Sequence, residues 1–210
     1  SRIKTKVTEH GNYSYTYDDL YRLKDASNPS LVPSESYTYD PLGNRLTDAK
    51  TTGTWSYNAN NQLQSFDGVS FEYDANGNAT KKIDFSDPIQ ARNYVYDISN
   101  RLIEVRDQSS ALIATYAYDP LNRRISKETT GSPGTKTYFL YADEGLLAEA
   151  STTGNITKVY GYRPNRTWGT DPLYLKEAAS IYYFQNDHLG TAQKLVSQNG
   201  QVVWSAKAEA

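Results

Sequence analysis

The sequence Tyr-Thr-Tyr-Asp-Pro-Leu-Gly-Asn occupies residues 37–44 and contains a complete strand-and-turn signal. Aromatic residues two positions apart point to the same face of a β-strand, where such side chains pack well. Asp40 can bond the backbone beyond it, Pro41 presets φ for a type I turn, and Gly43 supplies the left-handed residue that closes a bulged hairpin. We therefore predict a β-hairpin with its turn centred on residues 41–43.

The same pattern recurs along most of the chain: an aromatic residue, any residue, a second aromatic, then Asp or Asn. The second aromatic of the six clear copies falls at positions 17, 39, 57, 73, 96 and 118, and weaker copies occupy 138–141, 160–162 and 182–184. Most turns end in Gly or in Asn, the next-best left-handed residue, whereas the turn of residues 18–21 departs from this chemistry. The predicted structural turn residues are Asp40, Pro41, Gly43, Asp74, Gly77, Asp97, Asn100, Asp119 and Asn122.

The repeat predicts the fold class. After the turns come Arg or Gln and an aliphatic residue that we expect to be buried, at 22–23, 45–46, 62–63, 101–102 and 124–125. No extended helical stripe of apolar residues appears, although residues 176–179 could form a turn or two of helix. Because a lone hairpin is barely stable, we predict an all-β fold in which stacked hairpins form an antiparallel ribbon.

The amino-acid composition argues against several classes of function. The formal net charge is −2, and Lys and Arg are scattered, which argues against a nucleic-acid partner. There is no apolar run long enough to span a membrane. Cys is absent, and His10 and His188 are far apart in the sequence, so we expect no disulfide, no metal site and no cofactor.

Catalytic interpretations are weaker than structural ones. The aspartates follow the repeat, as expected of turn caps and not of an acid–base pair. Asp187 and His188 could form half of a catalytic relay, but no nucleophile is marked by the sequence. We therefore expect no enzymatic activity, and we interpret Asp187-His188 as a hydrogen-bonded turn.

The repeats resemble the tyrosine-aspartate (YD) repeats of the Rhs family of polymorphic toxins, which also occur in toxin-complex C subunits, wall-associated proteins and teneurins. Residues 182–191 and 200–204 resemble the start of the Rhs core-associated segment. The resemblance implies repeat hairpins over residues 1–178 and a truncated core-associated segment over 179–210. It also implies that the ribbon belongs to a spiral shell or barrel around a C-terminal toxin.

The resemblance also suggests partners and a location. The leading expectation is a structural fragment of the encapsulating shell of a secreted or cell-surface bacterial toxin, whose partner is the rest of its own polypeptide. The alternative is a surface module that binds carbohydrate or a receptor, because exposed aromatic rings can stack on sugars. Packing is the commoner role of alternating Tyr residues, so the candidates for sugar stacking are Trp55, Trp168 and Trp204.

Overall fold

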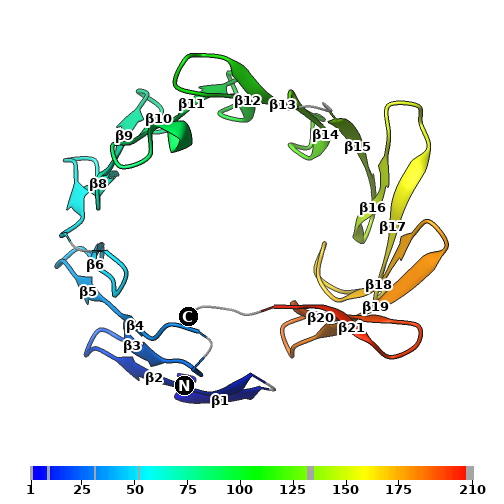
Figure 1. The fold of residues 1–210 in the computed structure, drawn as a ribbon, viewed down its shortest axis with the longest axis horizontal. Helices are drawn as coiled ribbons and strands as arrows, with labels where there is room; N and C mark the ends of the chain where they lie inside the picture. The colour runs from blue at the N-terminus through cyan, green and yellow to red at the C-terminus, as the bar shows by residue number, and fades with distance from the viewer. Residues whose placement is uncertain (1, 9, 31, 52, 132–134, 207–210) are drawn as a thin grey trace. The chain divides into compact units, whose positions relative to one another are not determined.

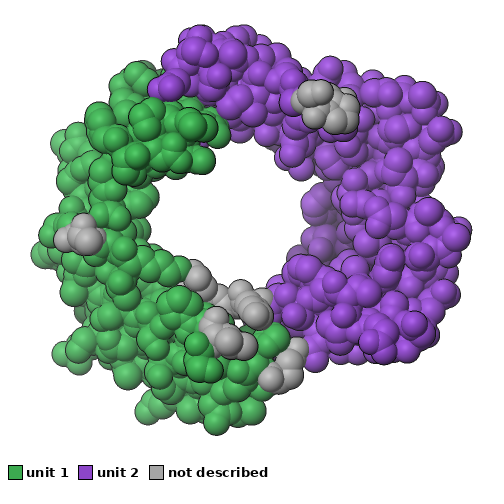
Figure 2. Space-filling model, viewed as in Figure 1, with its two compact units in different colours: residues 1–93, 207–210 green, residues 94–206 purple. Residues whose placement is uncertain are grey.

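The computed structural model describes residues 2–8, 10–30, 32–51, 53–131 and 135–206. The predicted all-β, antiparallel fold is confirmed, because consecutive strands pair antiparallel within each of three sheets of the described chain (Figure 1). The chain divides into two compact units, residues 1–93 and residues 94–206 (Figure 2).

The first unit contains a four-stranded sheet in the order β1-β2-β3-β4, the pair β5-β6, and the start of a 15-stranded sheet. Asp87 caps the 3-10 helix η1 of this unit by accepting from the Ile89 amide. The elements are β1 (Thr5–Thr8), β2 (Gly11–Tyr17), β3 (Leu23–Ser27), β4 (Glu35–Ser36), β5 (Thr38–Tyr39), β6 (Arg45–Thr47), β7 (Ser56–Tyr57), β8 (Leu63–Phe66), β9 (Val69–Tyr73), β10 (Ala79–Asp84), η1 (Pro88–Gln90) and the start of β11 (Arg92–Tyr96).

The second unit continues this sheet, whose strand order from β7 to β21 is the chain order. Strand β21 is paired with β20 and forms the last edge of the sheet. The strands that follow β11 are β12 (Leu102–Arg106), β13 (Leu112–Tyr118), β14 (Arg124–Thr129), β15 (Thr135–Ala142), β16 (Gly145–Ala150), β17 (Ile156–Tyr162), β18 (Pro172–Glu177), β19 (Ser180–Asn186), β20 (Ala192–Ser197) and β21 (Val202–Ser205).

One five-residue turn recurs along both units. Its first amide donates to the carbonyl of its fifth residue, and its fourth amide donates back to the first carbonyl. The fourth residue has a positive φ in each turn, which Gly and Asn adopt most readily. These turns span residues 18–22, 40–44, 58–62, 74–78, 97–101, 107–111, 119–123, 151–155, 187–191 and 197–201.

A β-bulge follows the turn. At the first hairpin, Tyr17 pairs with Leu23 and Thr16 pairs with Asp25, so Lys24 is the extra residue. The same shift follows the turns that begin at Asp40, Asn58 and Asp119. A bulge bends the strand and strengthens its twist, so regular bulges change the direction of the ribbon at each hairpin.

The hairpins bury few large apolar side chains. The buried apolar residues are mostly small, and no large side chain is fully buried in the described chain. Leu23, Leu46, Leu63 and Leu102 are half-buried and Ile125 is exposed, so the expected burial of these aliphatics is wrong. A ribbon without a packed second layer cannot cover them.

The suggested helix at residues 176–179 is also wrong. Strand β18 ends at Glu177, which pairs with Ser180 across a tight turn. Ala178 lies in that turn with φ of 51°, outside the right-handed helical region. Tyr174, Leu175 and Lys176 of β18 pair with Tyr183, Tyr182 and Ile181 of β19, so a β-hairpin takes the place of the suggested helix.

Candidate functional site

The structure brings the repeat residues together at the contacts between successive hairpins. Within most of the turns, an aspartate at the first position accepts hydrogen bonds from the turn backbone. Asp97 Oδ1 accepts from the amides of Ser99 at 2.9 Å and Arg101 at 3.0 Å, and its Oδ2 accepts from Arg101 Nε at 2.7 Å. The same pattern of acceptance recurs at Asp18, Asp40, Asp74 and Asp119.

These hydrogen bonds stabilise the ionised carboxylates. The Arg101 backbone N–H lowers the pKa of Asp97, burial opposes it, and the Arg101 side chain lowers it further. At Asp74 the side chain of Asn78 is the main cause of the lowered pKa. Burial acts in the raising direction at Asp18, Asp40 and Asp119, but their combined hydrogen bonds leave each pKa below its ordinary value.

The second aromatic of the repeat links one hairpin to the one before it. Its hydroxyl donates to the carbonyl of the first residue after the preceding turn, next to the bulge. In the first unit these bonds are Tyr39 to Leu23 at 2.6 Å, Tyr57 to Arg45 at 2.7 Å and Tyr73 to Leu63 at 2.7 Å. In the second unit they are Tyr118 to Leu102 at 2.8 Å and Tyr141 to Arg124 at 2.9 Å.

The last turn residue adds a charged contact to the same junction. Arg101 pairs with Asp97 in its own turn, and its Nη1 donates to the Asp119 carbonyl of the next turn at 3.1 Å. Its guanidinium lies 5.3 Å from the centre of the Tyr118 ring. Arg22 makes the equivalent contacts with Asp18, the Asp40 carbonyl and the Tyr39 ring.

A second arginine position stacks between aromatic rings. Arg45 lies over Tyr37 of its own hairpin at 4.0 Å and over Trp55 of the next at 5.6 Å. Arg124 lies over Tyr116 and Phe139 in the same way. The arginines that follow the aromatic pair of the repeat therefore occupy two different positions. Arg101 is the last residue of its turn, whereas Arg45 is the first residue after its turn.

Two weak repeat copies have a different register from the one their aromatic residues suggest. In the copy at 138–141 the aromatics in register are Phe139 and Tyr141, because Tyr141 makes the carbonyl bond. In the copy at 182–184 the first aromatic is Phe184 and Asn186 takes the second place. Asn186 Nδ2 donates to the Pro172 carbonyl at 2.8 Å, so an amide replaces the phenol.

The turn between β17 and β18 breaks the repeat. Its residues 163–171 form a longer loop that the Arg166–Asp171 ion pair holds at 3.1 Å. The Gly169 amide donates to the Glu144 carbonyl at 2.7 Å, and the Asp171 amide donates to the Gly190 carbonyl at 3.0 Å. The loop therefore joins the hairpin turns on both of its sides.

The three tryptophans lie in different surroundings, and the structure does not bring them together. Trp55 is half-buried against Phe66 and donates its Nε1 hydrogen to Thr51. Trp168 lies in the long loop, stacks on Tyr141 at 5.8 Å between ring centres, and is 51% exposed. Trp204 is 48% exposed on the edge strand β21. Of the three, Trp168 is the one with an exposed ring held by a defined neighbour.

The acidic residues form turns and ion pairs. Asp187 Oδ1 accepts from the amides of Leu189 and Thr191, so the Asp187-His188 pair lies in a five-residue turn like the others. Within the described ranges, no group of three or more His, Cys, Asp or Glu residues could hold a metal ion. The described helical residues also include no segment long and apolar enough to cross a bilayer.

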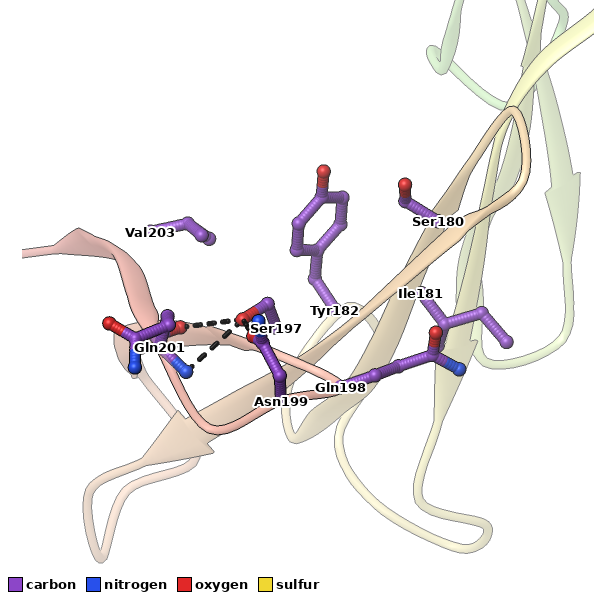
Figure 3. A pocket seen from close by; sticks show the side chains of 8 residues that line it. All are labelled: Ser180, Ile181, Tyr182, Ser197, Gln198, Asn199, Gln201 and Val203. Carbon is purple, nitrogen blue, oxygen red and sulfur yellow. Dashed lines mark hydrogen bonds between the residues drawn. The ribbon is translucent and has the colours of Figure 1, made fainter.

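A pocket of about 500 Å³ lies between the start of β19 and the 197–201 turn (Figure 3). Its lining is uncharged: Tyr182 and Val203 line it with the polar residues of the 197–201 turn. Ser197 Oγ bonds Asn199 Oδ1 and the Gln201 backbone, so no base activates it. The pocket can offer hydrogen bonds to a neutral polar ligand, and its residues supply no acid–base pair.

Removing one tyrosine hydroxyl is expected to weaken the contact between two hairpins. Tyr118→Phe should lower the free energy of unfolding by about 1 kcal/mol, because it removes one hydrogen bond and keeps the ring over Arg101. Chemical denaturation monitored by circular dichroism measures this. Tyr183→Phe is the control, since Tyr183 is 48% exposed and no described residue bonds its hydroxyl. Equal losses for both variants would contradict a special role for the Tyr118 bond.

The amino-acid sequence matches a known protein family. The sequence model described as "Teneurin YD-shell" matches residues 1–207. The chain belongs to this family of YD-repeat shells. Its repeats are therefore the YD repeats of Rhs-type proteins, as their sequence indicates.

Several curated relatives of the YD-shell chain are toxins. It is 31% identical to "Double-stranded DNA deaminase toxin A" of Burkholderia cenocepacia, over 98% of this chain and 16% of the relative. It is 31% identical to "tRNA nuclease WapA" of Bacillus subtilis, over 72% of this chain and 6% of the relative. "Toxin protein Tse5" of Pseudomonas aeruginosa is 27% identical, over 93% of this chain and 19% of that protein. The chain thus spans less than a fifth of each of these relatives.

Solved structures of toxin complexes are also similar. The Photorhabdus luminescens Tc holotoxin pore with TccC3 aligns at a TM-score of 0.38 and 16% identity, over 94% of this chain and 14% of the other. The crystal structure of TcdB2-TccC3 aligns at the same TM-score and identity, over 95% and 15% of the two chains.

Proposed function

We propose that this chain is a structural segment of the β-shell that encloses the toxic domain of a secreted or cell-surface bacterial Rhs-type toxin. Its partner is the remainder of the same polypeptide, and it performs no catalysis of its own. Residues 1–178 supply repeat hairpins, and residues 179–210 begin the core-associated segment.

The observation that carries this proposal is the recurring bond from a tyrosine hydroxyl to the carbonyl beside the preceding bulge. It joins hairpin to hairpin without needing a thick apolar core. A wall that must be one ribbon thick and still enclose a cargo needs such contacts along its length. The toxin relatives, which are several times longer than this chain, support a wall that serves a larger polypeptide.

Limited proteolysis of the longer parent polypeptide tests the proposal. The domain downstream of the shell should resist protease in the parent. Replacing Tyr57, Tyr73, Tyr118 and Tyr141 by Phe should make that domain digestible at lower protease concentration, because four contacts along the wall are weakened. A parent whose downstream domain is digested equally with and without these changes would contradict enclosure by this segment.

The isolated chain should have neither of the activities that name its relatives. We expect no deamination of double-stranded DNA and no cleavage of tRNA by residues 1–210, because the aspartates cap turns and Ser197 has no base. Mass spectrometry of the incubated nucleic acids, with an active toxin as positive control, checks this. Turnover that survives Asp97→Asn and Asp119→Asn would show a catalytic site elsewhere in the chain.

Carbohydrate binding is the second candidate function, and Trp168 is the observation that favours it. Its ring is half exposed and held against Tyr141 in the loop that breaks the repeat. An aromatic face of this kind can stack on a sugar ring. A glycan array should then show binding that Trp168→Ala abolishes and Trp55→Phe leaves intact, while loss in neither variant would eliminate this candidate.

A further inference from the structure

Strand β1 has an edge that no strand in the described chain covers. It is the outermost strand of the four-stranded sheet, and its inner edge pairs with β2 from Thr5↔Ser14 to Thr8↔Gly11. Val7 is 78% exposed and Ile3 is 56% exposed. An open edge presents unpaired N–H and C=O groups that can accept a further strand.

The inner edge of this segment already makes the contacts of a strand that follows a YD turn. Tyr17 donates its hydroxyl to the Ile3 carbonyl at 2.7 Å, as Tyr39 does to the Leu23 carbonyl. The Tyr15 amide donates to the Lys4 carbonyl at 2.9 Å, as the Tyr37 amide does to the bulged Lys24 carbonyl. Ile3 and Lys4 therefore hold the first and second positions after a turn.

Arg2 then occupies the last position of that turn. Its guanidinium lies 5.2 Å from the centre of the Tyr17 ring, close to the 4.6 to 5.3 Å of the arginines at the equivalent positions, which are Arg22 over Tyr39, Arg101 over Tyr118 and Arg123 over Tyr141.

The contact of Arg2 with the next turn supports this assignment. Arg101 Nη1 reaches Asn122, the left-handed residue of the next turn, at 3.3 Å. Arg2 reaches the residue at the same place, Tyr21, with 4.0 Å between the guanidinium and the ring centre. Tyr21 has φ of 67°, an unusual conformation for a tyrosine, and its ring lies against the Arg2 guanidinium in that conformation.

Arg2 differs from the other turn arginines because it has no acidic partner among the described residues. Arg22, Arg101 and Arg123 each bind the aspartate four residues earlier through Nε, at 2.6 to 2.7 Å. No carboxylate of the described residues pairs with Arg2. The described chain thus holds a turn arginine, with its stacking and its following strand, and lacks the aspartate and the strand that precede it in every other copy.

We propose that the outer edge of β1 binds an antiparallel strand of the same longer polypeptide, with the sequence aromatic-x-Tyr-Asp, whose aspartate pairs with Arg2. The inference rests on the proposed role in a larger shell. Its geometry is that of the other hairpins: the aspartate lies four residues ahead of Arg2, and the aromatic strand pairs with Thr5, Lys6 and Val7.

The test extends the full 210-residue chain with a copy of its own repeat. A copy of residues 112–121, joined directly to Ser1, places its aspartate four residues ahead of Arg2. Hydrogen exchange should show new protection of the outward-facing β1 amides. The melting temperature should rise by about 2–4 °C for each kcal/mol gained.

The matched control carries the same extension with one glycine inserted before Ser1. A shift of one residue turns every side chain to the opposite face and moves the aspartate away from Arg2, so protection should be lost. A second comparison combines Arg2→Gln with an extension whose aspartate is changed to asparagine. The two changes should be non-additive in melting temperature, because both remove one ion pair.

Equal protection by the in-register and shifted extensions would overturn the proposal, and so would additive effects of Arg2→Gln and the asparagine extension. The extension could fail to dock while the parent still protects its downstream domain from protease. That result would contradict the proposed strand at β1 and would still support the shell function. If the extension docks and the parent gives no protection, the β1 edge is supported and the enclosure is wrong.

Discussion

Gly190→Val is expected to be the most damaging single substitution in the turns, with a loss of about 3 kcal/mol in the free energy of unfolding. Gly190 is buried and has φ of 81°, a conformation that strains any β-branched residue. An added Cβ would also lie 3.0 Å from the Asp171 backbone nitrogen and 3.1 Å from Asp171 Cγ. Because the Asp171 amide donates to the Gly190 carbonyl, the new side chain would separate two bonded turns.

Gly200 is the matched control. It holds the same turn position with φ of 82°, and a Cβ there would meet nothing within 4 Å. Gly200→Val should therefore cost only the backbone strain, about 1–2 kcal/mol. Urea denaturation of both variants separates the two contributions. A Gly190→Val loss no larger than the Gly200→Val loss would show that the contact with Asp171 contributes nothing.

Local chemistry explains what could be predicted from the sequence. The aromatic pair and the Asp-to-Gly or Asp-to-Asn turn act over about eight residues, so residues 37–44 are sufficient to indicate a hairpin. Repetition of that pattern then predicts an antiparallel ribbon. The aromatic-pair pattern does not predict the turns at 107–111, 151–155 and 197–201, because no aromatic pair precedes them. Gly154 and Gly200 nevertheless supply the left-handed residue in two of these turns.

The contacts between hairpins could not be predicted in the same way. The Tyr118 hydroxyl donates to the Leu102 carbonyl 16 residues earlier, and no feature of the sequence marks that carbonyl as its acceptor. The roles of Arg101 and Arg45 differ by one position in the strand, which decides whether the guanidinium meets a carboxylate or two aromatic rings. The amide of Asn186 in place of a phenol is visible only when the neighbouring strand is present.

Acid is expected to destabilise the whole ribbon, because the aspartates of several turns are all stabilised in their ionised form. Hydrogen bonds keep the pKa of Asp18, Asp40, Asp74, Asp97 and Asp119 below the ordinary value in the folded chain. The unfolded chain then binds more protons below about pH 4, so stability falls as the pH falls. The stabilisation is complete above the unfolded pKa and is lost as the pH passes down through the folded pKa values. Melting temperatures between pH 7 and pH 3 should be level at first and decline below about pH 4.

Asp97→Asn separates charge from turn geometry. Asn58 holds the equivalent position in this chain, and its Oδ1 accepts from the amides of Asn60 at 3.0 Å and Gln62 at 2.9 Å. The variant should therefore keep the turn, lose the Arg101 ion pair, and contribute no proton uptake at this site. Its stability at pH 7 should be lower than that of the parent chain, and its decline in acid should be shallower. A variant whose decline matches the parent's would show that the Asp97 carboxylate does not take part in the acid response, and that the turns hold their shape through the backbone alone.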